Sequence, residues 1–191
     1  MKMTDSCRPH FFWQQLPLLF WGIAAGCLGL FLVCCAGSSW ADGSFLLLLL
    51  LLSMLDIRYG LLFDRLLLVL AVLGAMNGLA GNGWPWLLHL GGALAGGAIL
   101  WALRMLSHGG MGGGDIKLAF VLGFWLEAPA LLLALWLAFT AGGLWAGGLL
   151  LCGRCQRGAR LPFGPFLSLG AGLSYFYGSF FWEWYVGFCY G

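Results

Sequence analysis

Residues 109–119 read Gly-Gly-Met-Gly-Gly-Gly-Asp-Ile-Lys-Leu-Ala, and this stretch places an acid, Asp115, directly after a run of glycines. Apolar segments lie on both sides of it. Non-helical backbone at membrane depth has to be buried in protein or to line a water-filled cavity. An acid beside such backbone is a candidate functional residue. The stretch therefore predicts a site, to which the rest of the chain is expected to bring a second acid and a substrate.

The composition is that of a polytopic membrane protein. Hydrophobic residues make up 62% of the chain and charged residues only 8%, whereas a soluble domain carries about 25% charged residues. The net charge of +2 gives no sign of nucleic-acid binding. The seven cysteines lie mostly in or beside apolar segments, and we interpret them as small buried hydrophobes rather than a disulfide framework. We therefore expect a single integral-membrane domain over residues 1–191.

Seven apolar segments are candidates for membrane-spanning helices, each of which needs about 20 residues. They are Phe11–Ala36, Trp40–Ile57, Leu61–Ala80, Trp84–Leu106, Asp115–Leu126, Ala130–Cys152 and Phe166–Tyr185. The fifth is short, because Glu127 and Pro129 follow it. At 1.5 Å per residue, the part Ile116–Leu126 covers only about 17 Å. It is either a short tilted span or a re-entrant helix.

The basic residues favour the first of these alternatives. If all seven segments cross, every lysine and arginine falls on one side of the membrane: Lys2, Arg8, Arg58, Arg65, Arg104, Lys117, Arg154, Arg157 and Arg160. The opposite side holds Asp42, Glu127 and Glu183 and no basic residue. The positive-inside rule makes the basic side cytoplasmic. The sequence thus predicts an all-α bundle of about seven transmembrane helices with a cytoplasmic N-terminus, and it places Asp56 and Asp115 at the same cytoplasmic face.

Asp56 and Asp115 together have the composition of a paired-carboxylate site. Two carboxylates that share a site do not both ionise easily, so one of them holds a proton. The pair then offers a general base that activates water and a general acid that protonates the leaving group. Our hypothesis is that Asp115, at a helix N-terminus, is the ionised partner, and that Asp56, at a helix C-terminus, holds the proton. The simpler roles are an N-cap for Asp115 and an interfacial salt bridge with Arg58 or Arg65 for Asp56.

Three motifs carry a resemblance to a known family. Gly112-Gly113-Gly114-Asp115 fits a GxGD motif within Met111–Ala119. The other two motifs are Leu55–Leu66 before it and Leu161–Leu167 after it, and the three stand in the same order as in the family. Together they resemble the bacterial type IV prepilin peptidases, a family of GxGD aspartic peptidases. That family usually has Ile-Pro ahead of the Asp or Asn at the position of Asp64, and Phe63 departs from this pattern.

The resemblance implies an aspartic endopeptidase of the bacterial inner membrane, multi-pass and surrounded by lipid. It would cut the short basic leader, after a glycine, from type IV prepilins or the pseudopilins of type II secretion, at the cytoplasmic face. Asp56 and Asp115 would be the catalytic pair, and Gly112 and Gly114 would shape the loop. Lys117 would orient the site or counter its charge, although a plain interfacial lysine is an equal alternative. We interpret Asp64 as the cap at the start of the third helix. The sequence indicates neither the particular prepilin nor an oligomeric state.

Many members of the family also methylate the new N-terminus with S-adenosylmethionine. In those proteins a large cytoplasmic loop with paired Cys-x-x-Cys motifs follows the first span. Here only Gly37–Ser39 separate the first two apolar segments, so the resemblance is to a short form without this loop. We therefore favour a peptidase that needs no cofactor, with S-adenosylmethionine involved only if methylation is retained. The solitary pair Cys152 and Cys155 offers two of the four ligands that tetrahedral zinc needs, so no metal site is predicted.

Two other functions compete with this interpretation. A presenilin-like peptidase also uses GxGD, but its Tyr-Asp and Pro-Ala-Leu signatures are missing from the expected places. A small ion-coupled transporter would have a broken helix at residues 109–115 near the middle of the membrane. The distribution of charges places both acids at the membrane face, which weighs against a transporter.

Overall fold

The computed structural model describes residues 40–80, 86–107, 111–126, 128–152 and 162–190, and every regular element within them is an α-helix. The helices are α2 (Trp40–Tyr59), α3 (Asp64–Ala80), α4 (Trp86–Leu106), α5 (Gly113–Trp125), α6 (Ala128–Leu151) and α7 (Gly164–Tyr190). The all-α prediction is thus confirmed for the described part of the chain. The first predicted segment, Phe11–Ala36, lies outside the described residues.

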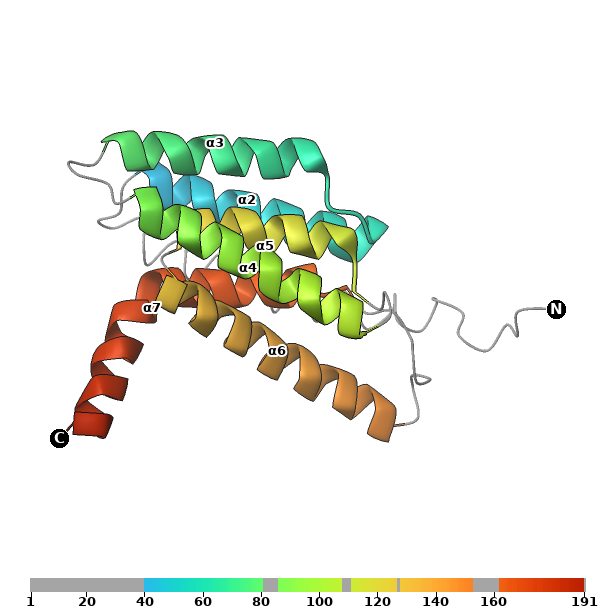
Figure 1. Ribbon diagram of the computed structural model, residues 1–191. Helices are drawn as coiled ribbons and strands as arrows, with labels where there is room; N and C mark the ends of the chain where they lie inside the picture. Colours follow the sequence, from blue (N-terminus) through green and yellow to red (C-terminus); the bar gives the residue numbers. More distant parts are fainter. Residues whose placement is uncertain (1–39, 81–85, 108–110, 127, 153–161, 191) are drawn as a thin grey trace.

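Successive helices run in alternating directions along the bundle (Figure 1). The ends of α2, α4 and α6 therefore lie at the same end of the molecule as the starts of α3, α5 and α7. In the part of the chain that the structure describes, two helices are long and apolar enough by themselves to cross a membrane, over Leu87–Leu106 and Ala128–Leu151. The six helices correspond to the second to seventh predicted segments, while the number that cross a membrane stays a prediction.

Several predicted helix boundaries were wrong by a few residues. Helix α5 begins at Gly113 and α7 at Gly164, each two residues earlier than predicted. Helix α6 begins at Ala128 and contains Pro129 in its first turn. Proline is tolerated there because the first amides of a helix have no partner inside it. Pro129 therefore opens α6 in addition to ending the preceding segment.

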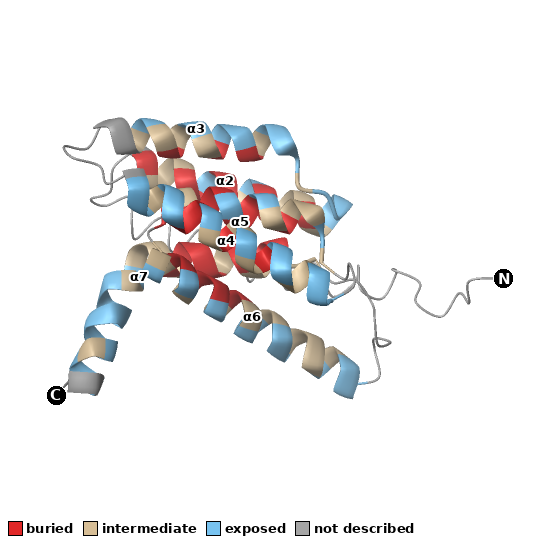
Figure 2. Cartoon of the chain, viewed as in Figure 1, coloured by how far each residue is buried: buried red, intermediate tan, exposed pale blue. Residues whose placement is uncertain are grey.

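The shortest helix, α5, lies in the middle of the bundle. It packs against α3, α4, α6 and α7, and seven of its thirteen residues are buried: Asp115, Leu118, Ala119, Val121, Leu122, Gly123 and Trp125. Figure 2 shows buried residues gathered on the inner faces of the helices and exposed residues on the outer faces. A helix enclosed in this way gains its stability from packing on several sides rather than from its own length.

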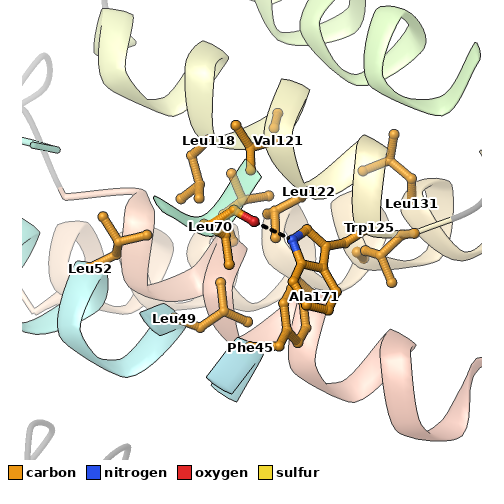
Figure 3. Close-up of a cluster of buried hydrophobic side chains, with 14 of the residues drawn as sticks. Phe45, Leu49, Leu52, Leu70, Leu118, Val121, Leu122, Trp125, Leu131 and Ala171 are labelled. Atoms are coloured by element: carbon orange, nitrogen blue, oxygen red, sulfur yellow. Dashed lines mark hydrogen bonds between the residues drawn. The ribbon is translucent and has the colours of Figure 1, made fainter. Parts of the chain in front are cut away.

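Trp125 joins the elements around α5 (Figure 3). Its indole Nε1–H donates a 2.7 Å hydrogen bond to the backbone carbonyl of Leu70 in α3. Its ring lies 4.6 Å, centroid to centroid, from that of Phe45 in α2. The indole has room because residue 74 in α3 is a glycine, and a Cβ added to Gly74 would lie 2.6 Å from Nε1. One side chain of α5 therefore fixes both α2 and α3.

Glycines bring α4 and α5 into backbone contact. A Cβ added to Gly92 would lie 2.5 Å from the carbonyl oxygen of Gly123, and one added to Gly96 would lie 2.7 Å from that of Ala119. Such distances leave no room for a side chain. Small residues at these positions allow the close helix approach that drives association in membranes.

Alanine at Gly92 is expected to destabilise the protein, whereas alanine at Gly91 is not. Gly92→Ala forces α4 away from α5 and is expected to cost about 1–3 kcal/mol. Gly91 is exposed and has no atom within 4 Å of an added Cβ, so Gly91→Ala is expected to gain up to about 1 kcal/mol in helix propensity. Thermal unfolding in detergent measures both. Equal melting temperatures for the two variants would contradict the tight α4–α5 contact.

Candidate active site

Asp56 lies in the last turn of α2 and is buried, with 6% of its surface exposed. The helix ends three residues later, at Tyr59, because Gly60 takes the left-handed conformation with φ of 62°. The N–H of Gly60 donates to the carbonyl of Asp56 at 2.8 Å. Glycine at this position is a common helix stop. Arg58 is exposed, and among the described residues no ion pair involves Asp56. The interfacial salt bridge is therefore not the role that the structure gives to this carboxyl group.

Asp115 is the third residue of α5 and is also buried, with 6% exposed. The N-cap of α5 is Gly112, which has an extended conformation and makes no side-chain capping hydrogen bond. The simpler alternative for Asp115, an N-cap, is therefore not the role that it has. Its carboxyl group instead turns back toward the backbone N–H of Gly112, as the third residue of a helix does in a capping box.

The glycines before Asp115 meet three different neighbours. A Cβ added to Gly112 would lie 3.1 Å from Oδ2 of Asp115, and one added to Gly114 would lie 2.9 Å from the side chain of Leu62. A Cβ added to Gly113 would lie 2.7 Å from Nη1 of Arg104. The predicted loop-shaping positions, Gly112 and Gly114, are thus places where a side chain would displace Asp115 or the segment that follows Asp56. The preceding residues 108–110 lie outside the described part of the chain.

The structure brings the two predicted carboxyl groups together. Asp56 at the end of α2 and Asp115 at the start of α5 lie at the same end of the bundle (Figure 1) and interact electrostatically. Both are largely removed from solvent. Two like charges in a low-dielectric site repel strongly, so the pair is set to share a proton.

Gly164 is a site residue that the sequence interpretation missed. It is the first residue of α7, and its backbone N–H donates a 3.0 Å hydrogen bond to Oδ2 of Asp56, 108 residues away. The contact is buried. A helix N-terminus attracts a carboxylate because its first amides have no other partner and carry positive partial charge. Leu-Pro-Phe-Gly-Pro at residues 161–165 had been noted as a motif, but nothing in its order showed that it would meet Asp56.

Lys117 binds Asp64 rather than either buried acid. Its Nζ lies 2.8 and 2.7 Å from the two carboxylate oxygens of Asp64, the first residue of α3. The side chains are 58% and 69% exposed, so the pair is worth at most about 1 kcal/mol. The pair links the start of α3 to the first turns of α5. The predicted roles of Lys117 in positioning or charge compensation stay predictions.

The arrangement has the parts needed for general acid–base chemistry by two carboxyl groups. Oδ2 of Asp56 is engaged by Gly164, which leaves Oδ1 for a proton or a water molecule. Among the described residues, no group of three or more His, Cys, Asp or Glu side chains could hold a metal ion. Cys152 is exposed, and Cys155 lies outside the described part of the chain.

Comparison with known proteins identifies the family. The model of the type IV leader peptidase family matches residues 43–147, which include both acids and the glycine run between them. The chain belongs to this family. No solved structure matches the chain.

Curated relatives are named as prepilin leader peptidases and N-methyltransferases. A prepilin leader peptidase/N-methyltransferase of Bacillus subtilis (strain 168) is 35% identical over 134 residues, covering 70% of this chain and 54% of that protein. Proteins of the same name from Aeromonas salmonicida (strain A449) and Stutzerimonas stutzeri are 33% and 29% identical over 140 and 195 residues. These matches cover 71% and 87% of this chain and 48% and 68% of the relatives. The chain thus spans about half the length of the first two.

Alanine at Gly164 is expected to be destabilising because of Asp56 itself. An added Cβ would lie 2.5 Å from Oδ2 and 3.0 Å from Cγ of Asp56, so Gly164→Ala is expected to cost about 1–3 kcal/mol of unfolding free energy. Asp56→Ala removes Oδ2 and Cγ of Asp56, which are the atoms that the added Cβ would meet. The loss of unfolding free energy in the double variant should therefore be smaller than the sum of the losses in the two single variants. Gly172→Ala is the matched control in α7, since its Cβ would be 3.7 Å from Leu46. Thermal unfolding of Gly164→Ala, Asp56→Ala, the double variant and Gly172→Ala measures the coupling. Strictly additive losses in the two single variants and the double variant would contradict the contact.

Proposed function

We propose that the chain is a membrane-embedded aspartic endopeptidase that removes the leader from type IV prepilins or type II secretion pseudopilins. The observation that carries the proposal is the pair of buried carboxyl groups, Asp56 and Asp115, at one end of the bundle. The family of the chain and the names of its relatives agree with it. The reaction is hydrolysis of a peptide bond.

The two carboxyl groups divide the chemistry between them. The ionised one removes a proton from water, which attacks the scissile carbonyl carbon, and the protonated one delivers a proton to the leaving amide nitrogen. The sequence-based hypothesis made Asp115 the base and Asp56 the acid, because only Asp115 was expected at a helix N-terminus. The hydrogen bond from the first amide of α7 to Asp56 removes that distinction, because each carboxyl group lies at a helix N-terminus. The pair is therefore best treated as a unit that titrates together.

The proposed topology has seven crossings with a cytoplasmic N-terminus, in a bacterial inner membrane. The alternating direction of α2 to α7 (Figure 1) supports an alternating passage. Arg58, Arg65, Arg104 and Lys117 all lie near the end of the bundle that holds the two acids. By the positive-inside rule this end is cytoplasmic, and cleavage takes place there.

The proposed substrate has a short basic leader that ends in glycine, followed by an apolar helix. The segment around the scissile peptide bond must be extended and exposed before water can reach that bond. Gly112, which has an extended backbone and is exposed directly before α5, offers main chain without a side chain, to which an extended segment can be paired. Lys117 lies on the exposed face of α5, two residues beyond Asp115, and we assign it to contacts with the arriving substrate.

Asparagine at either acid is expected to abolish leader removal. Asp56→Asn and Asp115→Asn keep the size of the side chain but remove the shared proton, and the loss of rate is expected to be at least about 100-fold. Asp42→Asn is the matched control, because Asp42 lies in the first turn of α2, where its carboxylate accepts a hydrogen bond from Tyr175. The measurement is the mass of a co-expressed prepilin. Cleavage that survives both substitutions would rule out the aspartic peptidase.

We further propose that this chain cleaves without methylating. The relatives are named as N-methyltransferases as well as peptidases, but the loop with paired cysteines has no counterpart between the first two apolar segments. The mature prepilin made with the wild-type chain is therefore expected to carry an unmodified N-terminus. A product heavier by one methyl group in the same mass spectrum would show that methylation, and hence S-adenosylmethionine, does not depend on that loop.

A further inference from the structure

Helix α7 changes direction where it leaves the bundle (Figure 1). Its first part is held inside, since Ala171 is buried and the hydroxyl of Ser174 donates to the backbone carbonyl of Ala130 in α6. Gly178 and Ser179 follow, and a Cβ added to Gly178 would lie 3.8 Å from that of Ala130. Glycine–serine pairs are among the known causes of sharp helix kinks. The second part of α7 then runs across the bundle direction, away from the other helices.

The second part of α7 is exposed over its whole described length. Every residue from 179 to 188 is exposed except the half-buried Val186 (Figure 2). Most of these residues are aromatic: Phe180, Phe181, Trp182, Trp184, Tyr185 and Phe188. Trp184 is 64% exposed and Phe188 is 79% exposed. Such a surface is unfavourable in water, so it needs an apolar or interfacial neighbour.

The small and charged residues of this part form one stripe. Ser179, Glu183 and Gly187 follow each other at intervals of four, which places them on one face of a helix. The aromatic residues occupy the remaining faces. Trp and Phe on the face opposite a polar residue are typical of a helix that lies in the plane of a membrane interface. Trp and Tyr are also the residues enriched at that depth.

The length of α7 points the same way. Its 27 residues would extend over about 40 Å if straight, whereas the hydrocarbon core is about 30 Å thick. The hydroxyl of Tyr175 donates to Asp42 in the first turn of α2, at the end of the bundle opposite Asp56, and a straight helix would carry Phe188 about 20 Å beyond Tyr175. The bend instead keeps the second part of α7 near that end of the bundle.

A cavity of about 770 Å³ occupies the corner between α6 and the second part of α7. Its lining includes Leu133 and Trp136 of α6 and Phe181, Trp182 and Tyr185 of α7. From these observations we infer that residues 179–188 lie flat in the membrane interface opposite the active site, with Glu183 toward water. The acyl chains of the phospholipids below them fill the corner cavity. This assignment does not depend on the proposed peptidase activity.

Fluorescence quenching by brominated phospholipids tests the inference. The full chain carrying Trp182→Phe and Trp184→Phe is reconstituted into vesicles of phosphatidylglycerol and phosphatidylcholine. The phosphatidylcholine chains are brominated either near the headgroup or near the chain end. Phe180→Trp or Phe188→Trp is then added, and the difference from the parent reports on that position alone. Unbrominated vesicles are the control, and an unchanged melting temperature in detergent shows that each variant is folded.

A flat interfacial helix is expected to lose fluorescence at both position 180 and position 188, with headgroup-proximal bromine the stronger quencher at each. A straight α7 would carry position 188 about 12 Å farther along the membrane normal than position 180. Position 188 would then be quenched far less than position 180 by either lipid, which would overturn the inference. Stronger quenching by bromine near the chain end would place the helix in the hydrocarbon core and would also overturn it. No quenching at either position would mean that a protein segment or a second copy covers this surface instead of lipid.

Discussion

The hydrogen bond from the backbone N–H of Gly164 to the carboxyl group of Asp56 is the interaction on which the rest of the site depends. It joins the end of α2 to the start of α7, and α2 and α7 pack along each other behind it. The donor is a main-chain N–H, and its residue has no side chain. Helix α7 can therefore approach Asp56 more closely than it could with any residue other than glycine at position 164. The position of Asp56 is therefore set by where α7 begins, and its distance from Asp115 by how α5 sits between these helices.

The central place of α5 explains how so short a helix remains in a membrane bundle. Thirteen residues rise only about 20 Å, too little to cross a hydrocarbon core of about 30 Å while facing lipid alone. Its neighbours α3, α4, α6 and α7 pack around it, and seven of its thirteen residues are buried. The glycine contacts with α4 and the indole of Trp125 hold it there.

The sequence predicted the parts of this structure that depend on local order. Apolar length located the six described helices, and the alternation of charge brought Asp56 and Asp115 to one end. It did not predict the partners of those acids. Gly164 and Asp56 are 108 residues apart. Lys117 forms an ion pair with Asp64 instead of with Asp56 or Asp115. The N-cap of α5 is Gly112, and a glycine cap gives no side-chain signal in the sequence. Contacts made by backbone amides leave no pattern of side chains to read.

The glycine contacts also limit how this chain can change in evolution. A substitution at Gly92 meets the backbone of Gly123, and that partner already has the smallest side chain, so no second change can restore the space. A substitution at Gly164 meets a side chain that could be shortened, but the side chain is that of Asp56. A second substitution cannot compensate for a change at Gly92, because no smaller residue exists for position 123. One cannot compensate at Gly164, because shortening Asp56 would remove its carboxyl group. Both glycines are therefore expected to accept fewer replacements than the leucines packed around them.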